Sequence, residues 1–313
     1  MNSDLYESEY FCISKSGKWS LKDEFPTGKQ VQESDPSAPV FPENIIKVLQ
    51  QCDVIFPVLH GTFGEDGTIQ GLFEMLHTPY IGCDYRSSAI AMDKVLTKII
   101  CSAAGIPVSP FLYYDVNDGK ESKFAFCEKI KKELRYPLFV KPAHLGSAIG
   151  VMRTDDPDQL EAVIDEVLQF DRKIIVEEEI RGREIEFAVL GNGSPTVFPP
   201  GEVLASGKMY SYEAKYGDSG FATDSQAKCS PEQIELGKGL ALSAYKSIGC
   251  EGMARVDFFL DQNGNFFLNE INPIPGFTAI SLYPKICENN GLSFQKLLDK
   301  LIILALRRHR DRK

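Results

Sequence analysis

The sequence predicts an α/β protein built from two or three domains. Its 313 residues exceed the usual size of one domain. Short apolar runs typical of strands alternate with segments whose apolar residues recur at helical spacing, a rhythm that indicates a mostly parallel sheet. Hydrophobic residues make up 43% and charged residues 25% of the chain, the balance of an ordinary folded protein. Wholesale disorder is therefore excluded.

The first strand-helix unit is predicted between residues 53 and 105. Residues 53–59 (DVIFPVL) form a nearly continuous apolar run, which predicts a strand. A glycine-rich turn follows, and residues 68–76 are expected to form a helix. A second helix is expected over residues 87–105, with Ser87 or Ser88 as its cap.

The second unit is predicted as three strands and one helix. The strands are expected at residues 138–141, 151–153 and 173–177. The helix is expected to begin after Asp156 as its cap, with Pro157 in the first helical position.

The last third of the chain is predicted to contain a long functional loop and three regular segments. Residues 191–230 are rich in Gly, Pro, Ser, Tyr and Asp without clear periodicity, which favours a loop. A helix at 231–248, a hairpin at 253–272 and a helix from Ser293 onward follow. The basic end RRHRDRK is interpreted as a solvated helix terminus, with contact to nucleic acid as a remote second interpretation.

Charge and composition narrow the classes of partner. The 44 acidic residues exceed the 34 basic ones and give a formal charge of −10, which argues against a general attraction to nucleic acid or an anionic membrane. The longest clean apolar run near the end is residues 301–306, far short of the roughly 20 residues that span a bilayer. An acidic start without an apolar centre lacks the features of a signal peptide, so we expect a cytoplasmic protein. The eight cysteines form no C-x-x-C pair, which argues against zinc or a disulfide framework.

The predicted hairpin carries the most informative polar residues. Its two apolar strands flank Asn263-Gly264, a dipeptide typical of a two-residue turn. Such a turn places two polar pairs directly opposite each other on one face of the hairpin: Asp257 with Glu270, and Arg255 with Asn272.

Two opposed carboxylates repel each other unless a positive charge lies between them. Oxygen ligands without Cys or His suit a hard cation such as Mg²⁺, so we expect Asp257, Glu270 and Asn272 to be metal ligands. The alternative is a solvent-exposed polar face neutralised by Arg255. The strongly apolar neighbours favour a half-buried hairpin and hence the metal site.

A magnesium ion held by few carboxylates usually brings a phosphate group with it. The sequence contains neither a Walker P-loop nor a G-x-G-x-x-G turn. Lys141, which ends an apolar strand and precedes HLGSAIG, is the best candidate for a phosphate contact, although it also suits a surface position. Lys94 is a weaker one. The glutamate-rich tract at residues 174–189 suits either a solvated loop or a strand edge that pairs with a nucleobase and ribose.

Seven segments, taken together and in order, resemble the D-alanine–D-alanine ligase family. They are LHGTFGEDGTIQG (59–71), AMDK (91–94), FVKP with HLGSAIGV (139–151), EEEIRGREIEFAVLGN (177–192), YEAKY (212–216), ARVDFFL (254–260) and NEINPIPGFTAISLYP (269–284). The resemblance extends from about residue 11 to the end of the chain and implies an ATP-grasp fold.

The resemblance implies a role for each matching residue. The implied ATP-binding residues are Lys94 and Lys141 on the phosphates, Glu177, Glu178 and Ile180 at the adenine, Glu184 at the ribose, and also Lys215 and Asn269. Asp257, Glu270 and Asn272 match the ligands of two Mg²⁺ ions, for which Mn²⁺ is a possible substitute. Arg255 and the backbone at Gly276 match the groups that stabilise the oxyanion, and the Ser147 loop matches the one that closes over the phosphates. His60 matches a contact with the first D-alanine, and Ser281 and Leu282 match contacts with the second. Tyr216 matches the residue that is typical of enzymes with a D-alanyl acceptor.

The resemblance also implies an organisation and an activity. We expect a Rossmann-like N-terminal substrate domain (1–86), a central ATP-grasp lid domain (87–176) and a C-terminal domain with the metal site and a long lid loop (177–313). The implied reaction joins two D-alanines through D-alanyl phosphate for peptidoglycan synthesis, in a cytoplasmic homodimer that binds neither nucleic acid nor membrane. The alternatives are a related carboxylate-amine ligase of the D-Ala-D-Ser or D-Ala-D-Lac type, and a nucleotide-binding variant with impaired catalysis.

The resemblance is weakest at the start of the chain. The family begins with a strand, a Gly-Gly turn and a helix carrying a Ser and a Glu, and that Glu binds the amino group of the first substrate. Residues 11–21 resemble the family's second strand, so we expect the first β-α unit to be missing through truncation or a misassigned start. Ser147 and Tyr216, which link to that Glu in the family, would then lack this partner.

Overall fold

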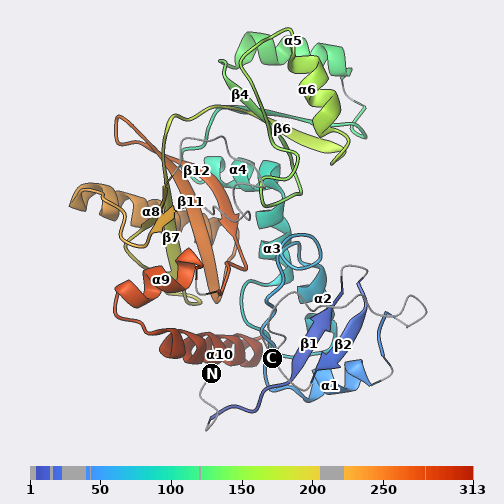
Figure 1. The fold of residues 1–313 in the computed structure, drawn as a ribbon, viewed down its shortest axis with the longest axis vertical. Helices are drawn as coiled ribbons and strands as arrows, with labels where there is room; N and C mark the ends of the chain where they lie inside the picture. Colours follow the sequence, from blue (N-terminus) through green and yellow to red (C-terminus); the bar gives the residue numbers. More distant parts are fainter. Residues whose placement is uncertain are drawn as a thin grey trace.

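The protein is an α/β protein, as the sequence predicts. A computed structural model describes residues 5–14, 17–22, 40–42, 44–119, 121–204, 222–278 and 280–312. A four-stranded sheet, a larger central sheet and a two-stranded ribbon follow one another along the long axis of the molecule (Figure 1). In the described part of the chain, no helix is both long and apolar enough to cross a membrane.

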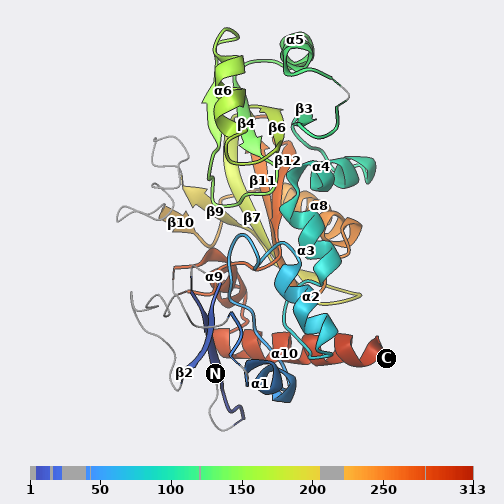
Figure 2. The ribbon, with the colours of Figure 1, turned by 90° about the vertical axis from the view of Figure 1, so that its right-hand side faces the viewer.

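The central sheet has the strand order β10-β9-β7-β11-β12, and β8 pairs with β7. Its strands are β7 (Gly182–Leu190), β8 (Thr196–Val197), β9 (Gly201–Leu204), β10 (Ala222–Asp224), β11 (Met253–Asp261) and β12 (Phe266–Asn272). One face packs on α8 (Pro231–Ser247) through a cluster of edge-to-face rings, Phe187, Phe258 and Phe266. The other face packs on α9 (Leu282–Asn289) and α10 (Phe294–Asp311) at one end (Figure 2), and carries the polar residues of the hairpin at the other.

The hairpin β11–β12 has the polar pairing that the sequence predicts. Asp257 lies opposite Glu270 and Arg255 opposite Asn272. The turn is longer than the predicted two residues, because the Asp261 side chain accepts hydrogen bonds from the backbone of Asn263 and Asn265. A bulge after Asp257 shifts the register back, so the predicted pairs survive although the predicted turn is wrong.

The region at 191–230 is not simply a loop. Its described residues contribute the short strands β8, β9 and β10 to the central sheet. Strands of two to four residues between glycines and prolines are too short to show periodicity, which explains the wrong prediction. Residues 205–221 lie outside the described part of the chain.

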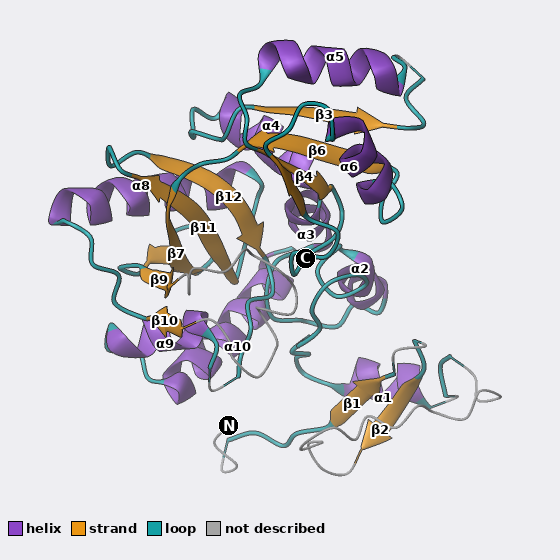
Figure 3. Ribbon diagram, turned by 45° about the horizontal axis from the view of Figure 1, so that its top comes forward, coloured by secondary structure: helices purple, strands orange, loops and turns teal. Residues whose placement is uncertain are grey.

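The four-stranded sheet has the order β3-β6-β4-β5 and is antiparallel. Its elements are β3 (Phe111–Asp115), α5 (Lys123–Glu133), β4 (Leu138–Pro142), β5 (Met152–Thr154), α6 (Leu160–Val167) and β6 (Lys173–Glu178), with both helices packed on one core (Figure 3). Helix α6 begins three residues after the predicted start, because Asp156 caps a separate turn through the backbone N–H of Asp158.

The helix predicted over residues 87–105 is divided in two. Helix α3 (Tyr85–Met92) is capped by Asp84 rather than by a serine, and α4 (Lys94–Ala103) is capped by Asp93. The Asp93 side chain accepts from the backbone N–H groups of Val95 and Leu96. Asp93 therefore ends α3 and begins α4, although the apolar residues on either side continue at helical spacing.

The N-terminal part contains the ribbon β1 (Tyr10–Ile13) and β2 (Trp19–Lys22), followed by α1 (Ile45–Gln51) and α2 (Thr68–Met75). The expected strand at 53–59 is reduced to a parallel bridge between Ile55 and Tyr80. Pro57 lacks a backbone N–H, which limits further pairing. Among the described residues the named strands all pair antiparallel, so the expectation of a mostly parallel sheet is wrong.

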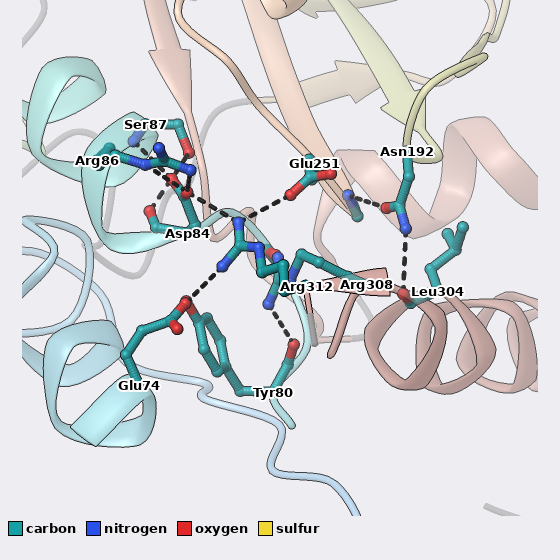
Figure 4. A network of polar contacts seen from close by, with 12 residues as sticks. Glu74, Tyr80, Asp84, Arg86, Ser87, Asn192, Glu251, Leu304, Arg308 and Arg312 are labelled. Atoms are coloured by element: carbon teal, nitrogen blue, oxygen red, sulfur yellow. Dashed lines mark hydrogen bonds and ion pairs between the residues drawn. The ribbon is translucent and has the colours of Figure 1, made fainter. Parts of the chain in front are cut away.

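The basic end of α10 is only partly the solvated terminus that the sequence predicts: Arg307 and Arg310 are exposed, but Arg308 and Arg312 form a clamp (Figure 4). Arg308 is 6% exposed, donates to the backbone carbonyls of Tyr80 and Gly82, and stacks 4.4 Å from the Tyr80 ring centroid. Arg312 forms ion pairs with Glu74, Asp84 and Glu251. These contacts fasten the N-terminal region to the helix that supports the central sheet.

We expect Arg308→Ala to lower the free energy of unfolding by about 3 kcal/mol, because two buried carbonyls lose their donor and the ring stacking is lost. Arg310→Ala is the matched control, because Arg310 lies two residues further along the same helix and its side chain is exposed. This substitution should lower the free energy of unfolding by no more than about 0.5 kcal/mol. Urea unfolding of both variants measures the difference. Equal stability of the two would contradict the clamp.

Candidate active site

Three carboxylates lie side by side across three neighbouring strands of the central sheet. Asp257 on β11 is opposite Glu186 on β7 and opposite Glu270 on β12. Glu184 lies two residues before Glu186 on the same face of β7. Carboxylate oxygens of Glu184, Glu186 and Asp257 lie within 4.8 Å of one another, and all three residues are buried.

Arg255 offsets part of this negative charge. Its Nε and Nη2 donate to the two oxygens of Asp257 at 2.8 and 2.7 Å, and Nε lies 3.0 Å from an oxygen of Glu186. Burial opposes the charged guanidinium, yet Asp257 and Glu186 raise the pKa of Arg255. One guanidinium among four carboxylates leaves a local excess of negative charge.

The amide of Asn272 supports the cation interpretation of this face. Its Oδ1 is buried and has no hydrogen-bond partner among the residues that the structure describes. A buried oxygen of this kind is costly unless a cation or a solvent molecule meets it. The donor set of Asp257, Glu270 and Asn272 thus fits a hard divalent ion. The geometrically closest carboxylates are nevertheless Glu184 and Glu186 with Asp257, so the predicted set shares only Asp257 with them.

A buried ion triad lies beside the carboxylates, on the four-stranded sheet. Glu177 accepts from Lys141 at 2.6 Å and from Lys98 at 3.0 Å. Burial alone would raise the pKa of Glu177, but the two lysines hold it at about 2. Lys98 also donates to the carbonyl of Leu268 on β12 at 3.0 Å, so this side chain joins the two sheets.

Lys94 faces both sheets. Its Nζ donates to the Leu145 carbonyl at 2.5 Å, and its backbone N–H donates to Ala143. Removal from water lowers the pKa of Lys94, while nearby Glu270 opposes this effect. The electrostatic contact with Glu270 places the Lys94 amine within reach of the carboxylate row.

The loop after Lys141 has an unusual backbone. Ser147 and Ala148 both have left-handed φ values, 56° and 57°, which non-glycine residues rarely adopt. Gly150 closes the loop, where a Cβ atom would lie 2.8 Å from the Phe170 ring. Such strain is typical of segments that contact a ligand.

The residues expected near the substrates lie in the segments that precede α2 and α9 and at the start of α9. Removal of the ring from water lowers the pKa of His60, a hydrogen bond with the Ile274 backbone opposes this shift, and the positive charge of Arg255 adds to it. Ser281 is the residue directly before α9, and its Oγ accepts from the Thr278 N–H at 3.0 Å rather than from the helix backbone. A Cβ atom on Gly276 would lie 2.6 Å from that Oγ, so any other residue there would force the Ser281 side chain to move.

The other predicted residues are distributed as follows. Glu178 accepts from the backbone N–H of Arg135 at 3.0 Å, and Ile180 is half-buried just beyond the end of β6. Asn269 lies on β12 at the bulge, and Leu282 is buried at the start of α9. Lys215 and Tyr216 lie outside the described residues.

Three residues at the site were missed from the sequence: Lys98, Glu186 and Glu65. Lys98 lies one helical turn after Lys94 and Glu186 alternates with Glu184, so helical and strand periodicity respectively would have placed them. Glu65 accepts from the Gly61 N–H at 2.5 Å, and burial raises its pKa to about 7, with Glu270 adding to the rise. Its signal was the acidic pair in the motif GEDG.

Comparisons with known proteins identify the family. A family model described as D-ala D-ala ligase C-terminus matches residues 100–303, and one described as D-ala D-ala ligase N-terminus matches residues 1–83. The chain belongs to the D-alanine–D-alanine ligase family. Among its relatives are the D-alanine–D-alanine ligases of Caldicellulosiruptor bescii and Solibacter usitatus. Each is 42% identical over the whole of this chain, which spans 90% and 89% of them respectively.

Solved structures agree with this assignment to the ligase family. The D-alanine–D-alanine ligase from Coxiella burnetii has a TM-score of 0.73 and 39% identity, over 83% of this chain and 70% of that chain. The VanG D-Ala:D-Ser ligase from Enterococcus faecalis has a TM-score of 0.74 and 39% identity, over 81% and 73%. The predicted ATP-grasp fold is confirmed.

We expect Lys98→Met to lower the free energy of unfolding by about 3 kcal/mol at pH 7, because buried Glu177 would lose one of its two cations. A folded-state pKa of about 2 means that Glu177 contributes stability above its ordinary pKa and loses it as pH falls. The difference in the free energy of unfolding between the unaltered protein and the variant should therefore become smaller as pH falls from 7 to 3. Denaturant unfolding at both pH values measures this difference in the free energy of unfolding. Lys47→Met, at an exposed position of α1, is the control. A deficit independent of pH would contradict the triad.

Proposed function

We infer that this chain is an ATP-dependent ligase that joins two D-alanines to D-alanyl-D-alanine, for peptidoglycan precursor synthesis. In this reaction the carboxylate of the first D-alanine receives the γ-phosphoryl group of ATP, and the amine of the second displaces phosphate. The observation that carries the inference is the meeting of the two sheets. Lys94 interacts electrostatically with Glu270 of the hairpin, and Lys98 bonds both Glu177 on one sheet and the Leu268 carbonyl on the other.

This arrangement suits a nucleotide triphosphate bound as its magnesium complex. Anionic phosphates complement the lysines, and the divalent ion complements the carboxylates. We propose that Lys94 and Lys141 bind the phosphates, and that Glu177, Glu178, Ile180, Glu184, Lys215 and Asn269 hold the rest of the nucleotide. Lys98 then acts by keeping Glu177 charged and in place.

We propose that Asp257, Glu270 and Asn272 hold two Mg²⁺ ions, with Mn²⁺ as a substitute. When bound, such ions withdraw charge from the transferring phosphoryl group. Asn272 contributes a buried oxygen already free of described partners, and Asp257 is held in one orientation by the two donors of Arg255. Glu270 is near enough to Lys94 to influence its pKa, so metal and phosphate contacts are adjacent.

The remaining residues suit the amino-acid substrates. The Arg255 guanidinium lies between the metal face and His60, where it can stabilise the oxyanion formed when the amine attacks. We propose that Gly276 contributes its backbone N–H, that His60 contacts the first D-alanine, and that Ser281 and Leu282 contact the second. Ser147 and Tyr216 are proposed to belong to segments that exclude water from the acylphosphate.

Several broader expectations belong to the same proposal. The domain limits 1–86, 87–176 and 177–313, the homodimer and the cytoplasmic location remain predictions. The choice of acceptor is tested with a panel of D-alanine, D-serine and D-lactate, each measured by phosphate release. Preference for D-alanine at neutral pH is expected, and preference for D-lactate would contradict the proposed product.

We expect Asn272→Ala to raise the Mg²⁺ concentration for half-maximal activity about tenfold and to lower kcat about 100-fold, because the site loses one oxygen ligand. Asn263→Ala removes the same amide from the exposed turn of the same hairpin and should leave both values unchanged. D-alanine-dependent release of phosphate from ATP, titrated with MgCl₂ after EDTA treatment, measures them. Equal Mg²⁺ dependence of the two variants would contradict the metal assignment.

A further inference from the structure

His144 has carboxylates at both ring nitrogens. Nδ1 lies 2.9 Å from an oxygen of Asp171, and Nε2 lies 3.3 Å from an oxygen of Asp93. The backbone N–H of His144 also donates to Asp171, at 2.8 Å. None of these three residues takes part in the functional roles described above.

The geometry requires a charged ring. A neutral imidazole carries one N–H, so one of its nitrogens would present a lone pair to a carboxylate. Two facing carboxylates are both satisfied only when both nitrogens carry a proton. Hydrogen bonds from the ring to Asp171 and Asp93 accordingly raise the pKa of His144 to about 9, while burial opposes the rise. The ring is therefore an imidazolium at neutral pH.

The two carboxylates belong to different parts of the site. Asp93 caps α4, the helix whose first residue is Lys94. Asp171 lies in the turn before β6 and also accepts from the backbone N–H of Lys173. His144 itself begins the strained loop that contains Ser147. One side chain thus connects the start of this loop with the helix that carries Lys94.

Neighbouring contacts hold the same junction. The backbone N–H of Lys94 donates to the Ala143 carbonyl at 3.0 Å, and the Ala143 N–H donates to the Lys173 carbonyl at 2.9 Å. Lys173 is the other cation that faces this junction, with its Nζ 2.6 Å from Asp93. Asp93 is therefore shared between Lys173 and His144, whereas the His144 ring is the only side-chain cation paired with Asp171 among the described residues.

We propose that His144 is a positioning residue whose charged ring clamps the phosphate loop, residues 143–150, to the start of α4. The clamp sets the distance between the loop and the Lys94 amine, and so the affinity for the nucleotide phosphates. This rests on the proposed nucleotide site, and it adds a specific pH dependence to it. With a pKa of about 9, the ring is charged in the folded protein below that pH, and the clamp is lost as pH rises through about 9. The contribution of this ring to the free energy of unfolding is complete below about pH 6.5, the ordinary pKa of histidine, and is lost as pH rises through about 9.

The first measurement follows the ring itself. The chain has 4 histidines, so selective labelling gives four imidazole signals, and His144→Asn identifies the one that is lost. We expect the His144 signal to titrate near pH 9. Asp171→Asn keeps an oxygen for the ring and the backbone but removes one charge, so it should move the titration to lower pH. Titration near 6.5 in the unaltered protein would overturn the proposal.

The second measurement follows nucleotide affinity. Calorimetry with a non-hydrolysable ATP analogue and Mg²⁺ gives Kd between pH 6.5 and 10. We expect Kd to rise above pH 9 in the unaltered protein, and to be about tenfold higher and flatter with pH in His144→Asn, because an amide can donate to only one of the two carboxylates. The same substitution at exposed His77 should reproduce the unaltered profile.

The outcomes separate this inference from the proposed function. A Kd and pH profile for His144→Asn equal to those of His77→Asn would overturn the clamp. If His144→Asn does not fold, Asp171→Asn is the deciding variant. Both the His144 titration and the pH at which Kd rises should move to lower pH in this variant, and values equal to those of the unaltered protein would overturn the clamp. Absence of D-alanine-dependent ATP turnover in the unaltered protein, with the expected titration and Kd profile intact, would overturn the ligase function and leave the clamp standing.

Discussion

The repulsion among carboxylates on one face of the central sheet is the constraint on which the site depends. Glu186, Asp257 and Glu270 are in direct register on three adjacent strands, and Asp257 has no exposed surface. Directly opposed like charges destabilise a sheet. Arg255 relieves part of the repulsion and fixes the orientation of Asp257. The remaining negative charge and the buried Asn272 oxygen make this face a receptor for cations.

The second sheet supplies the opposite charge. Lys98 and Lys141 hold Glu177 ionised in a buried position, and Lys98 reaches across to the backbone of β12. A buried ion group contributes little net stability, because desolvation offsets much of its attraction. Its contribution is geometric, since it fixes one sheet relative to the other. Each charge set is only partly neutralised internally, by Glu177 among the lysines and by Arg255 among the carboxylates, so a polyanion with a bound metal ion is complementary to both sheets at once.

Much of this site could be predicted from the hairpin alone, because period-2 alternation fixes which side chains share a face. The turn was predicted incorrectly, but the bulge after Asp257 restored the register where the charges lie. Periodicity failed where a charged residue is buried. Lys98 was missed, and Arg308 was interpreted as part of a solvated helix terminus, because nothing in the sequence shows that Lys98 pairs with Glu177 or that Arg308 donates to the Tyr80 carbonyl. Such pairs join segments far apart in the chain, and only the fold brings them together. Likewise, the cap at Asp93 was missed inside an apolar helical pattern, and only the hydrogen bonds from the Val95 and Leu96 N–H groups show it.

The central claim is that the carboxylate face binds divalent metal together with a nucleotide. Crystals grown with MnCl₂ and a non-hydrolysable ATP analogue test it through the anomalous scattering of manganese. We predict manganese peaks bounded by Asp257, Glu270 and Asn272, with analogue phosphates between them and the amines of Lys94 and Lys141. Nucleotide bound without manganese at these three residues, or manganese found only at other positions, would contradict the account.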